Sequence, residues 1–216
     1  MAEAGLLDGG APDVVVVDYG LGNLRSVVGA VERLGFTALI SSDPDDLERA
    51  GRLILPGVGA FGDGMRKLRE RGLVEVLDRL VLDGGKPILG ICLGAQLMAT
   101  GSSEFGEHRG LGWIDARVEL IAPADPALRV PHVGWNQLEL VRETPLLAGI
   151  ADGSLFYFVH SFHLVCTDAS VVAGVTDYGA KLVAVIARDN VFGTQFHPEK
   201  SQLGGLTLLE NFLTRC

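Results

Sequence analysis

Residues 86–96, KPILGICLGAQ, contain an apolar run that ends at a cysteine placed between two glycines. The run predicts a buried β-strand and the residues from Gly94 onward predict a helix, so Cys92 lies in the sharp turn between them. Gly90 and Gly94 leave space for such a turn, and G-x-C-x-G is the thiol counterpart of the G-x-S-x-G nucleophile elbow. Cys92 is therefore predicted to be a nucleophile. The alternative is a small core residue, because free cysteine is often buried.

The segments before this stretch alternate between strand and helix patterns. Strands are predicted at 13–20, 36–40 and 52–56. Helices are predicted at 22–35, 41–50 and 64–82. This alternation favours a doubly wound, mostly parallel sheet with right-handed crossovers. In such a sheet ligands bind at the carboxyl ends of the strands, which is where the Cys92 turn would lie.

The segments after about residue 112 change to strand patterns with few helices between them. They lie at 116–121, 136–141, 154–166, 170–179, 181–189 and 190–196, before a closing amphipathic helix at 204–216. Consecutive strands predict antiparallel additions to the sheet. The expected fold is thus α/β, with one domain over 13–216 and a mostly parallel, doubly wound sheet extended by antiparallel strands in the C-terminal half. Residues 1–12 are expected to be a flexible extension.

The composition excludes several classes of protein. Although 48% of the residues are hydrophobic, no apolar run approaches the ~18 residues that a membrane span needs. The net charge of −9 argues against a nucleic-acid partner. The three cysteines, Cys92, Cys166 and Cys216, include no C-x-x-C pair, so no metal site or disulfide framework is expected and a reducing cytoplasm fits. No cofactor is expected either, since Arg25 replaces the third glycine of a dinucleotide fingerprint in GLGNLR, 20–25.

A cysteine nucleophile needs a base, and one of the five histidines has a carboxylate placed to assist it. In GTQFHPEKS, 193–201, Pro198 is expected to keep the chain extended, so that Glu199 projects to the same side as His197. Glu199 would then orient the imidazole as the third member of a triad. His160 and His163 lie in an aromatic strand and are interpreted as packed histidines.

A third element is LPGVGAF, 55–61, at the end of another predicted strand. Gly57 and Gly59 around Val58 allow backbone N–H groups to turn toward a bound group, which suits an oxyanion hole together with the N–H of Leu93. The alternative is an ordinary glycine turn.

These three motifs, in this order, resemble class I (triad) glutamine amidotransferases. DYGLGNLRSV (18–27), PHVGWN (131–136) and YFVHSF (157–162) narrow the resemblance to the glutaminase subunits of imidazole glycerol phosphate synthase. Two positions depart from the usual pattern: Ala95 replaces a frequent methionine and Phe162 a frequent tyrosine.

The resemblance implies that Cys92 attacks glutamine, that His197 shuttles the proton and that Glu199 orients His197. It implies that ammonia passes to a (β/α)₈ cyclase subunit, which makes imidazole glycerol phosphate and an aminoimidazole carboxamide ribotide in histidine biosynthesis. The residues implied to hold glutamine are Gln96, Glu104, Ser161 and Phe162. Those implied at the partner interface are Gly22, Asn23, Trp135, Asn136 and Lys200.

Three other functions fit parts of the sequence. An amidotransferase for anthranilate, aminodeoxychorismate or pyridoxal phosphate synthesis is disfavoured by PHVGWN together with DYGLGNLRS. A cysteine peptidase or glyoxalase would also carry a thiol elbow, but the H-P-E triplet and the P-G-V-G loop disfavour it. A non-catalytic, flavodoxin-like binding module would need only a packed cysteine.

Overall fold

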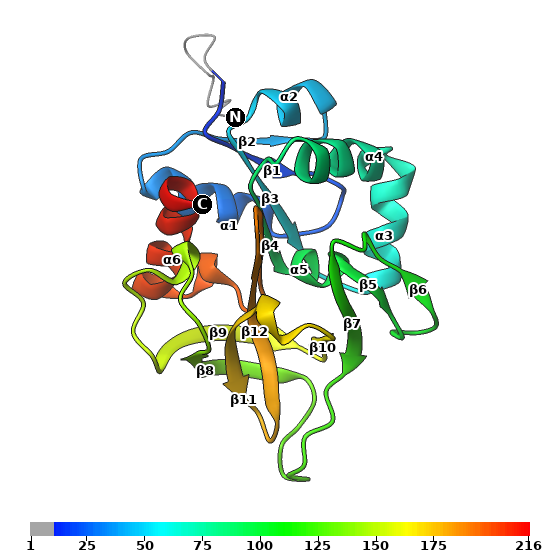
Figure 1. The fold of residues 1–216 in the computed structure, drawn as a ribbon, viewed down its shortest axis with the longest axis vertical. Coiled ribbons are helices and arrows are strands. Elements are labelled where there is room, and N and C mark those ends of the chain that lie inside the picture. Colours follow the sequence, from blue (N-terminus) through cyan, green and yellow to red (C-terminus); the bar gives the residue numbers. More distant parts are fainter. Residues whose placement is uncertain (1–10) are drawn as a thin grey trace.

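A mixed β-sheet of nine strands forms the centre of the protein in this computed structural model, which describes residues 11–216. The strand order is β2-β1-β3-β4-β13-β12-β11-β8-β9 (Figure 1). The first five strands in that order run parallel. They are β2 (Ala38–Ser41), β1 (Val14–Val17), β3 (Arg52–Gly57), β4 (Ile88–Cys92) and β13 (Val191–Thr194). The predicted α/β fold is confirmed, while residues 1–10 of the predicted extension lie outside the described residues.

The remaining strands of the sheet are antiparallel, as predicted for the C-terminal half. They are β12 (Lys181–Arg188), β11 (Val172–Asp177), β8 (His132–Leu140) and β9 (Ser154–His160). In Figure 1 this half lies below the parallel strands and their helices. A second sheet beside it has the order β10-β7-β5-β6. Its strands are β10 (Phe162–Cys166), β7 (Ile114–Leu120), β5 (Ala99–Ser102) and β6 (His108–Arg109).

The prediction of one strand at 154–166 is wrong, because the chain crosses from the first sheet to the second at Ser161. β9 ends at His160 and β10 begins at Phe162. The alternation of apolar side chains continues through the crossing, so the pattern gives no sign of it. The crossing places Ser161 and Phe162 between the two sheets.

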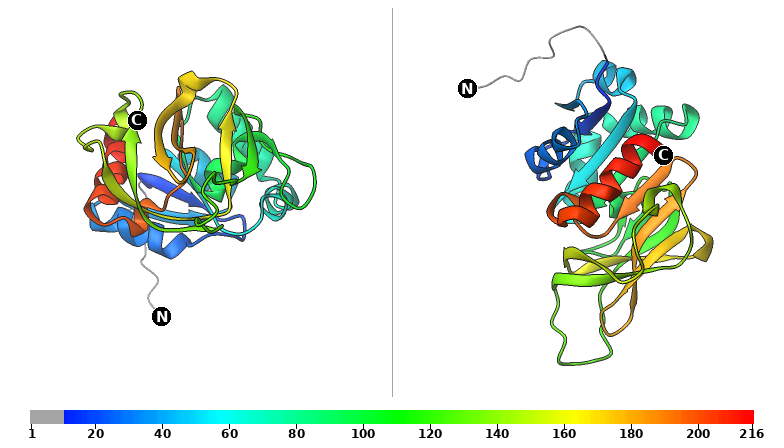
Figure 2. Two further views of the ribbon diagram at one scale, coloured as in Figure 1. Left: turned by 90° about the horizontal axis from the view of Figure 1, so that it is seen from below. Right: turned by 90° about the vertical axis from the view of Figure 1, so that its left-hand side faces the viewer.

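Helices cover both faces of the parallel strands. α1 (Leu24–Arg33) and α6 (Gln202–Arg215) lie side by side on one face (Figure 2), with their buried residues in one hydrophobic cluster. The other face carries α2 (Pro44–Arg49), α3 (Phe61–Glu70), α4 (Leu73–Asp78) and α5 (Leu93–Leu97). Three short 3₁₀ turns occupy Pro145–Leu147, Ala169–Val171 and Pro198–Lys200. Within residues 11–216 no helix has the length and apolarity required to cross a membrane.

The single helix predicted at 64–82 is in fact broken. α3 ends before Gly72, which has a left-handed φ of +65°, and α4 follows and continues into a π-helical turn at Arg79–Asp83. Met65 and Leu77, on either side of the break, are buried in the same hydrophobic cluster. The apolar residues therefore keep a helical spacing across the break, and Gly72 is the only feature of the sequence that indicates it.

The strand–turn–helix at Cys92 packs against its neighbours without space for side chains. A Cβ atom added to Gly94 would lie 1.7 Å from the Leu55 carbonyl oxygen, and one added to Gly90 would lie 2.6 Å from the Ala95 Cα. Real Cβ atoms do not approach backbone atoms so closely, so α5 can rest on β3 and β4 only because both positions are glycine.

This contact predicts opposite results for two glycine-to-alanine substitutions. Gly94→Ala should lower the free energy of unfolding by more than ~3 kcal/mol, because the new methyl group displaces α5. Gly29→Ala is the matched control, since Gly29 is exposed on α1 with open space around it; it should raise stability by up to ~1 kcal/mol. Urea unfolding followed by circular dichroism measures both, and equal midpoints would contradict the close-contact interpretation.

Candidate active site

Cys92 lies at the end of β4 in a strained backbone conformation, as predicted for an elbow. Its φ is +54° and its ψ is −112°, a region that residues other than glycine rarely occupy. The side chain is 8% exposed. The sulfur is therefore largely buried but lines a cavity that opens to the surface. Strain of this kind is retained where the surrounding packing enforces it, and it is concentrated at active sites.

His197 reaches Cys92 because β13 pairs in parallel with β4, with Thr194 beside Ile91. The His197 Nδ1 lies 2.8 Å from the Glu199 Oε1, and the two side chains are 3% and 1% exposed. The predicted contact between these residues is present. The extended conformation predicted for it is wrong: Pro198 begins a 3₁₀ turn, closed by a hydrogen bond from the Lys200 N–H to the His197 carbonyl oxygen at 3.0 Å.

The His197 ring is set to carry a positive charge. Burial lowers its pKa, but the interactions of the ring with Cys92 and with the Glu199 carboxylate outweigh burial and raise the pKa to about 9. A protonated imidazole beside a thiol stabilises the thiolate, which is the nucleophilic form of cysteine. The three side chains therefore have the chemistry of a thiol–imidazole–carboxylate triad.

The 57–59 loop lies beside the thiol, since β3 pairs with β4 and sets Gly57 opposite Cys92. Val58 is 41% exposed. Gly59 has a φ of +99° and no atom within 4 Å of an added Cβ. The peptide between Val58 and Gly59 therefore has room to reorient toward the pocket.

Gly57 is held much more tightly than Gly59. An added Cβ would lie 2.4 Å from the Tyr19 hydroxyl oxygen and 2.8 Å from the Leu93 Cβ. Tyr19 is fully buried, and its hydroxyl has no hydrogen-bond partner among the described residues. The 57–59 loop is thus held by close packing at Gly57, against Leu93, and has open space around Gly59.

Cys92 and His197 line a cavity of about 360 Å³. Its walls come from the 57–59 loop, the elbow, the Glu104 turn, the β9–β10 crossing and the residues after β13. The lining residues are Val58, Gly59, Cys92, Leu93, Gln96, Glu104, Pro131, Val159, His160, Ser161, Phe162, His197 and Lys200. All four residues predicted to hold glutamine line it.

Two of these residues have defined hydrogen bonds. The Gln96 Nε2 donates to the Phe162 carbonyl oxygen at 2.8 Å and to the Gln195 Oε1 at 2.9 Å. The Glu104 Oε2 accepts from the Phe61 N–H at the start of α3, at 2.6 Å. Both polar groups are thus fixed at the wall before any substrate binds.

The sequence did not identify Gln195, Pro131, Val159 or His160 as site residues. The Gln195 Nε2 lies 3.7 Å from the Cys92 sulfur. Its position two residues before His197 was the available signal, because both follow the strand that pairs with β4. Pro131, Val159 and His160 come from loops and strands whose position depends on the crossing at Ser161, which the pattern does not reveal.

The predicted interface residues are placed differently from one another. Lys200 lines the cavity, Trp135 is 45% exposed and Asn23 is exposed at the start of α1. Gly22 packs against Pro56, 3.4 Å from an added Cβ. The Asn136 side chain points inward, and its Nδ2 donates to the Asp177 carbonyl oxygen at 2.8 Å.

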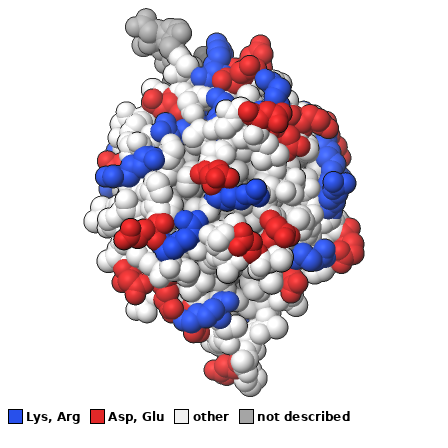
Figure 3. All heavy atoms as spheres, in the orientation of Figure 1, with Lys and Arg blue, Asp and Glu red and all other residues white. Residues whose placement is uncertain are grey.

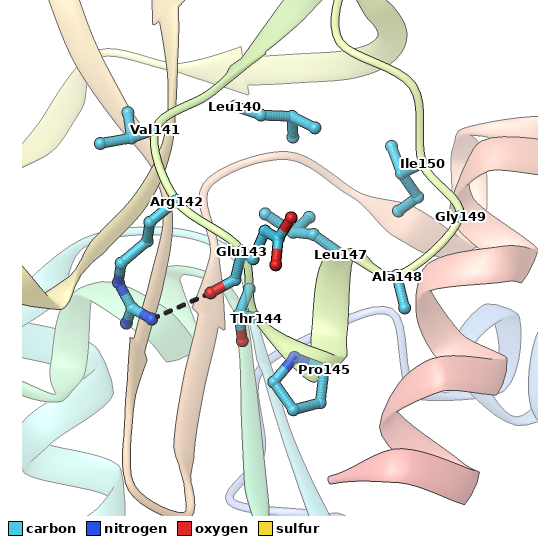
Figure 4. Close-up of a pocket in the computed structure, with 10 residues that line it drawn as sticks. All are labelled: Leu140, Val141, Arg142, Glu143, Thr144, Pro145, Leu147, Ala148, Gly149 and Ile150. Carbon is cyan, nitrogen blue, oxygen red and sulfur yellow. Dashed lines mark hydrogen bonds between the residues drawn. The ribbon is translucent and has the colours of Figure 1, made fainter.

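A larger cavity of about 670 Å³ is lined by residues between Leu140 and Ile150, all of them except Leu146 (Figure 4). Its charged side chains are Arg142 and Glu143, and the guanidinium of Arg142 donates to the Glu143 carbonyl oxygen at 3.4 Å and to the Ala187 carbonyl oxygen. It contains no predicted site residue, and the smaller cavity at Cys92 has the reactive groups.

Within residues 11–216 there is no group of three His, Cys, Asp or Glu side chains that could hold a metal ion. On the face shown in Figure 3, acidic and basic side chains alternate without forming a continuous basic field.

Fold and site together define a class of α/β protein in which a thiol at a strand–helix elbow lies beside an imidazole–carboxylate pair. Residues 15–216 match the family model described as glutamine amidotransferase class-I, and the chain belongs to this family.

The relatives make the assignment more specific. The chain is 48% identical over 205 residues, 93% of its length and 97% of the relative, to imidazole glycerol phosphate synthase subunit HisH 2 of Nitrobacter winogradskyi. It is 51% identical over 199 residues, 92% of its length and 94% of the relative, to the HisH subunit of Aquifex aeolicus. The structure of PurLQS from Thermotoga maritima has the same fold, with a TM-score of 0.73 at 23% identity over 94% of this chain and 98% of that one.

The charge on His197 can be tested through Glu199→Gln. Loss of the carboxylate should lower the pKa of His197 from about 9, which histidine NMR titration measures. The folded pKa lies above the ordinary 6.5, so the charge on the ring contributes its full stabilisation at pH values below 6.5. This stabilisation is lost as the pH rises through about 9. The substitution should therefore destabilise the protein at about pH 6 more than at about pH 10. An unchanged titration would show that Glu199 does not control the ring.

Proposed function

We propose that this chain is the glutaminase subunit of an imidazole glycerol phosphate synthase and supplies ammonia to a (β/α)₈ cyclase subunit. The observation that supports this most is the Cys92 elbow beside the buried His197–Glu199 pair, in a chain whose relatives bear that subunit's name. Membership of an amidotransferase family disfavours the non-catalytic module. The names of the relatives disfavour the anthranilate, aminodeoxychorismate and pyridoxal phosphate alternatives. We place the protein in the cytoplasm, where thiols stay reduced.

Catalysis begins with His197 protonated and Cys92 as the thiolate, which attacks the side-chain carboxamide of glutamine. The oxyanion that forms accepts hydrogen bonds from the Leu93 N–H and from the reoriented peptide at Val58. The proton on His197 then passes to the leaving nitrogen, and ammonia departs from a thioester on Cys92. Water, deprotonated by His197, attacks the thioester, and glutamate departs to leave the Cys92 thiolate beside the protonated ring. Glu199 keeps the Nδ1 side of the ring engaged throughout.

The walls of the cavity suit the head group of glutamine. Glu104 supplies a carboxylate for the α-ammonium group, with one oxygen anchored by the start of α3. The Gln96 amide is anchored through both of its N–H bonds, which leaves its carbonyl oxygen as an acceptor. Ser161 and Phe162 close the cavity on the side of the β9–β10 crossing.

The partner surface proposed here is the outer face of the β8–β9 hairpin, defined by Val133, Trp135, Leu155 and Val159. Their exposed fractions are 55%, 45%, 54% and 37%. Val133 pairs with Val159 across the hairpin, so the apolar side chains form one patch. Val159 also lines the catalytic cavity. The outer face is therefore continuous with the cavity, and a subunit bound there would cover the route by which ammonia leaves before water protonates it.

The experiment that tests this function is glutamine hydrolysis with and without the cyclase subunit encoded by the same organism. The stimulated complex should release glutamate, and a glutamine-analogue electrophile should label Cys92, as mapped by mass spectrometry. Cys92→Ala should abolish labelling and reduce turnover by on the order of 10⁴-fold or more. Cys166→Ala is the matched control, because Cys166 lies on β10 and does not line the cavity. Labelling at Cys166, or no turnover with the cyclase present, would overturn the proposal.

A second prediction concerns the outer face of the hairpin. Trp135→Ala should weaken association with the cyclase by ~10-fold or more, because exposed aromatic anchors supply much of the binding energy at interfaces. Leu82→Ala is the control, since Leu82 is 54% exposed but lies in the π-helical turn at Arg79–Asp83, outside the β8–β9 hairpin. Calorimetry measures association, and equal affinity for the Trp135 and Leu82 variants would place the interface elsewhere.

Lys200→Ala should reduce stimulation by the cyclase more than it changes the KM for glutamine.

A further inference from the structure

Two buried histidines that the mechanism above does not use lie in contact with each other. The His132 Nδ1 is 3.0 Å from the His160 Nε2, and the two residues are 3% and 6% exposed. The Asn136 Nδ2 lies 3.2 Å from the other ring nitrogen of His132. The His160 Nδ1 lies 2.9 Å from the Phe162 carbonyl oxygen. The four residues thus form an unbroken polar chain inside the protein.

Only one assignment of protons satisfies this chain. The Phe162 carbonyl oxygen can only accept, so the His160 Nδ1 donates and its Nε2 must accept. The His132 Nδ1 is then the donor to His160, and the His132 Nε2 accepts from the Asn136 amide. Burial lowers the pKa of His132 to about 4 and that of His160 to about 3, so both rings are neutral near pH 7, as this arrangement requires.

The chain continues from the Phe162 carbonyl oxygen to the sulfur. That oxygen also accepts from the Gln96 Nε2 at 2.8 Å, and the same nitrogen donates to the Gln195 Oε1 at 2.9 Å. The Gln195 Nε2 then lies 3.7 Å from the Cys92 sulfur. Every step thus lies within hydrogen-bonding range, from the inner face of β8 to the nucleophile of the proposed glutaminase.

The other end of the chain lies directly behind the proposed docking surface. His132 and Asn136 alternate along β8 with Val133 and Trp135, which form part of the outer face. Successive residues of a strand point to opposite faces, so a displacement of β8 moves both sets together. A subunit that binds the outer face therefore contacts the same strand that carries His132 and Asn136.

We propose that His132 and His160 are positioning residues that hold the Phe162 carbonyl, and with it the Gln96 and Gln195 side chains, at a fixed position relative to the Cys92 sulfur. Through the same hydrogen bonds, the two histidines couple this position to the position of β8. The proposal rests on the proposed function, because it assigns the chain to glutamine binding and to stimulation by the partner. The alternative is aromatic packing alone. His132 stacks on Phe158 at 4.9 Å and on Tyr178 at 4.1 Å between ring centroids.

Two substitutions at His160 each remove one hydrogen bond of this ring and keep the other. His160→Gln places an amide oxygen near the former Nε2 and keeps an acceptor for His132, but it removes the donor to the Phe162 carbonyl. His160→Asn places an amide N–H near the former Nδ1 and keeps that donor, but it removes the acceptor for His132. His163→Asn is the matched control, because His163 is a half-buried histidine on the adjacent strand, outside the chain.

The variants are compared in the complete complex with the cyclase subunit, by steady-state glutamine hydrolysis and thermal unfolding. His160→Gln should raise the KM for glutamine by ~10-fold, the effect of one buried hydrogen bond. His160→Asn should keep the KM within ~2-fold of the original but reduce partner stimulation by ~10-fold or more. His163→Asn should change neither quantity. If both His160 variants lower the unfolding temperature but leave the KM and stimulation unchanged, the rings serve packing only and the proposal is wrong.

A second measurement tests the chain without any assay of activity. Nitrogen-15 NMR of histidine-labelled protein should show both rings as neutral Nδ1–H tautomers, with a coupling across the hydrogen bond between them. An Nε2–H tautomer at either residue would overturn the proposed order of donors. If the unsubstituted complex hydrolyses no glutamine, the proposed function fails and this role fails with it. If partner stimulation is normal in the unsubstituted complex and in both His160 variants, the proposed function stands and only the role of the hydrogen-bonded chain is overturned.

Discussion

The constraint on which the rest of the structure depends is the contact of α5 with the backbone of β3 and β4. The Gly94 Cα faces the Leu55 carbonyl oxygen so closely that even a methyl group is excluded. This contact leaves Cys92 in a conformation with positive φ at the turn between β4 and α5. Most of the side chains that line the cavity are placed by their relation to this turn. The strain at Cys92 is maintained by the packing around it, as expected where backbone geometry serves a site.

The second requirement is the return of the chain to the middle of the sheet. β13 inserts in parallel beside β4, although it is joined to β12 by an antiparallel turn. Without this pairing, His197 would lie in the antiparallel half, away from the sulfur. The Glu199 carboxylate is buried with the ring, and its Oε2 has no hydrogen-bond partner among the described residues. A hydrophobic pair would serve stability as well as a buried charged pair, although removal of one charged partner is costly, so the presence of the pair favours a functional explanation.

Local features of the site could be predicted from the sequence, and long-range ones could not. The glycines around Cys92 and the H-P-E triplet act over a few residues, so they indicated the elbow and the carboxylate contact. The position of Gln195 depends on which strand β13 pairs with, and strand order is not encoded in local patterns. The crossing at Ser161 was missed because alternation continues through it, and the break at Gly72 because its apolar face does. His160 was interpreted as packed, and burial alone cannot distinguish a packed ring from one that also forms directed hydrogen bonds.

In the proposed coupling, the two faces of β8 link a buried site to an external subunit without a large conformational change. Val133 and Trp135 on the outward face are apolar and exposed, while His132 and Asn136 on the inward face belong to the polar chain. A hydrogen bond depends on the angle at its donor as well as on distance, whereas dispersion contacts have no preferred direction. A shift of β8 by a fraction of an ångström would therefore change the geometry at the Phe162 carbonyl while leaving the hydrophobic core intact. The same strand thus carries the proposed docking surface on one side and the start of the proposed polar chain on the other.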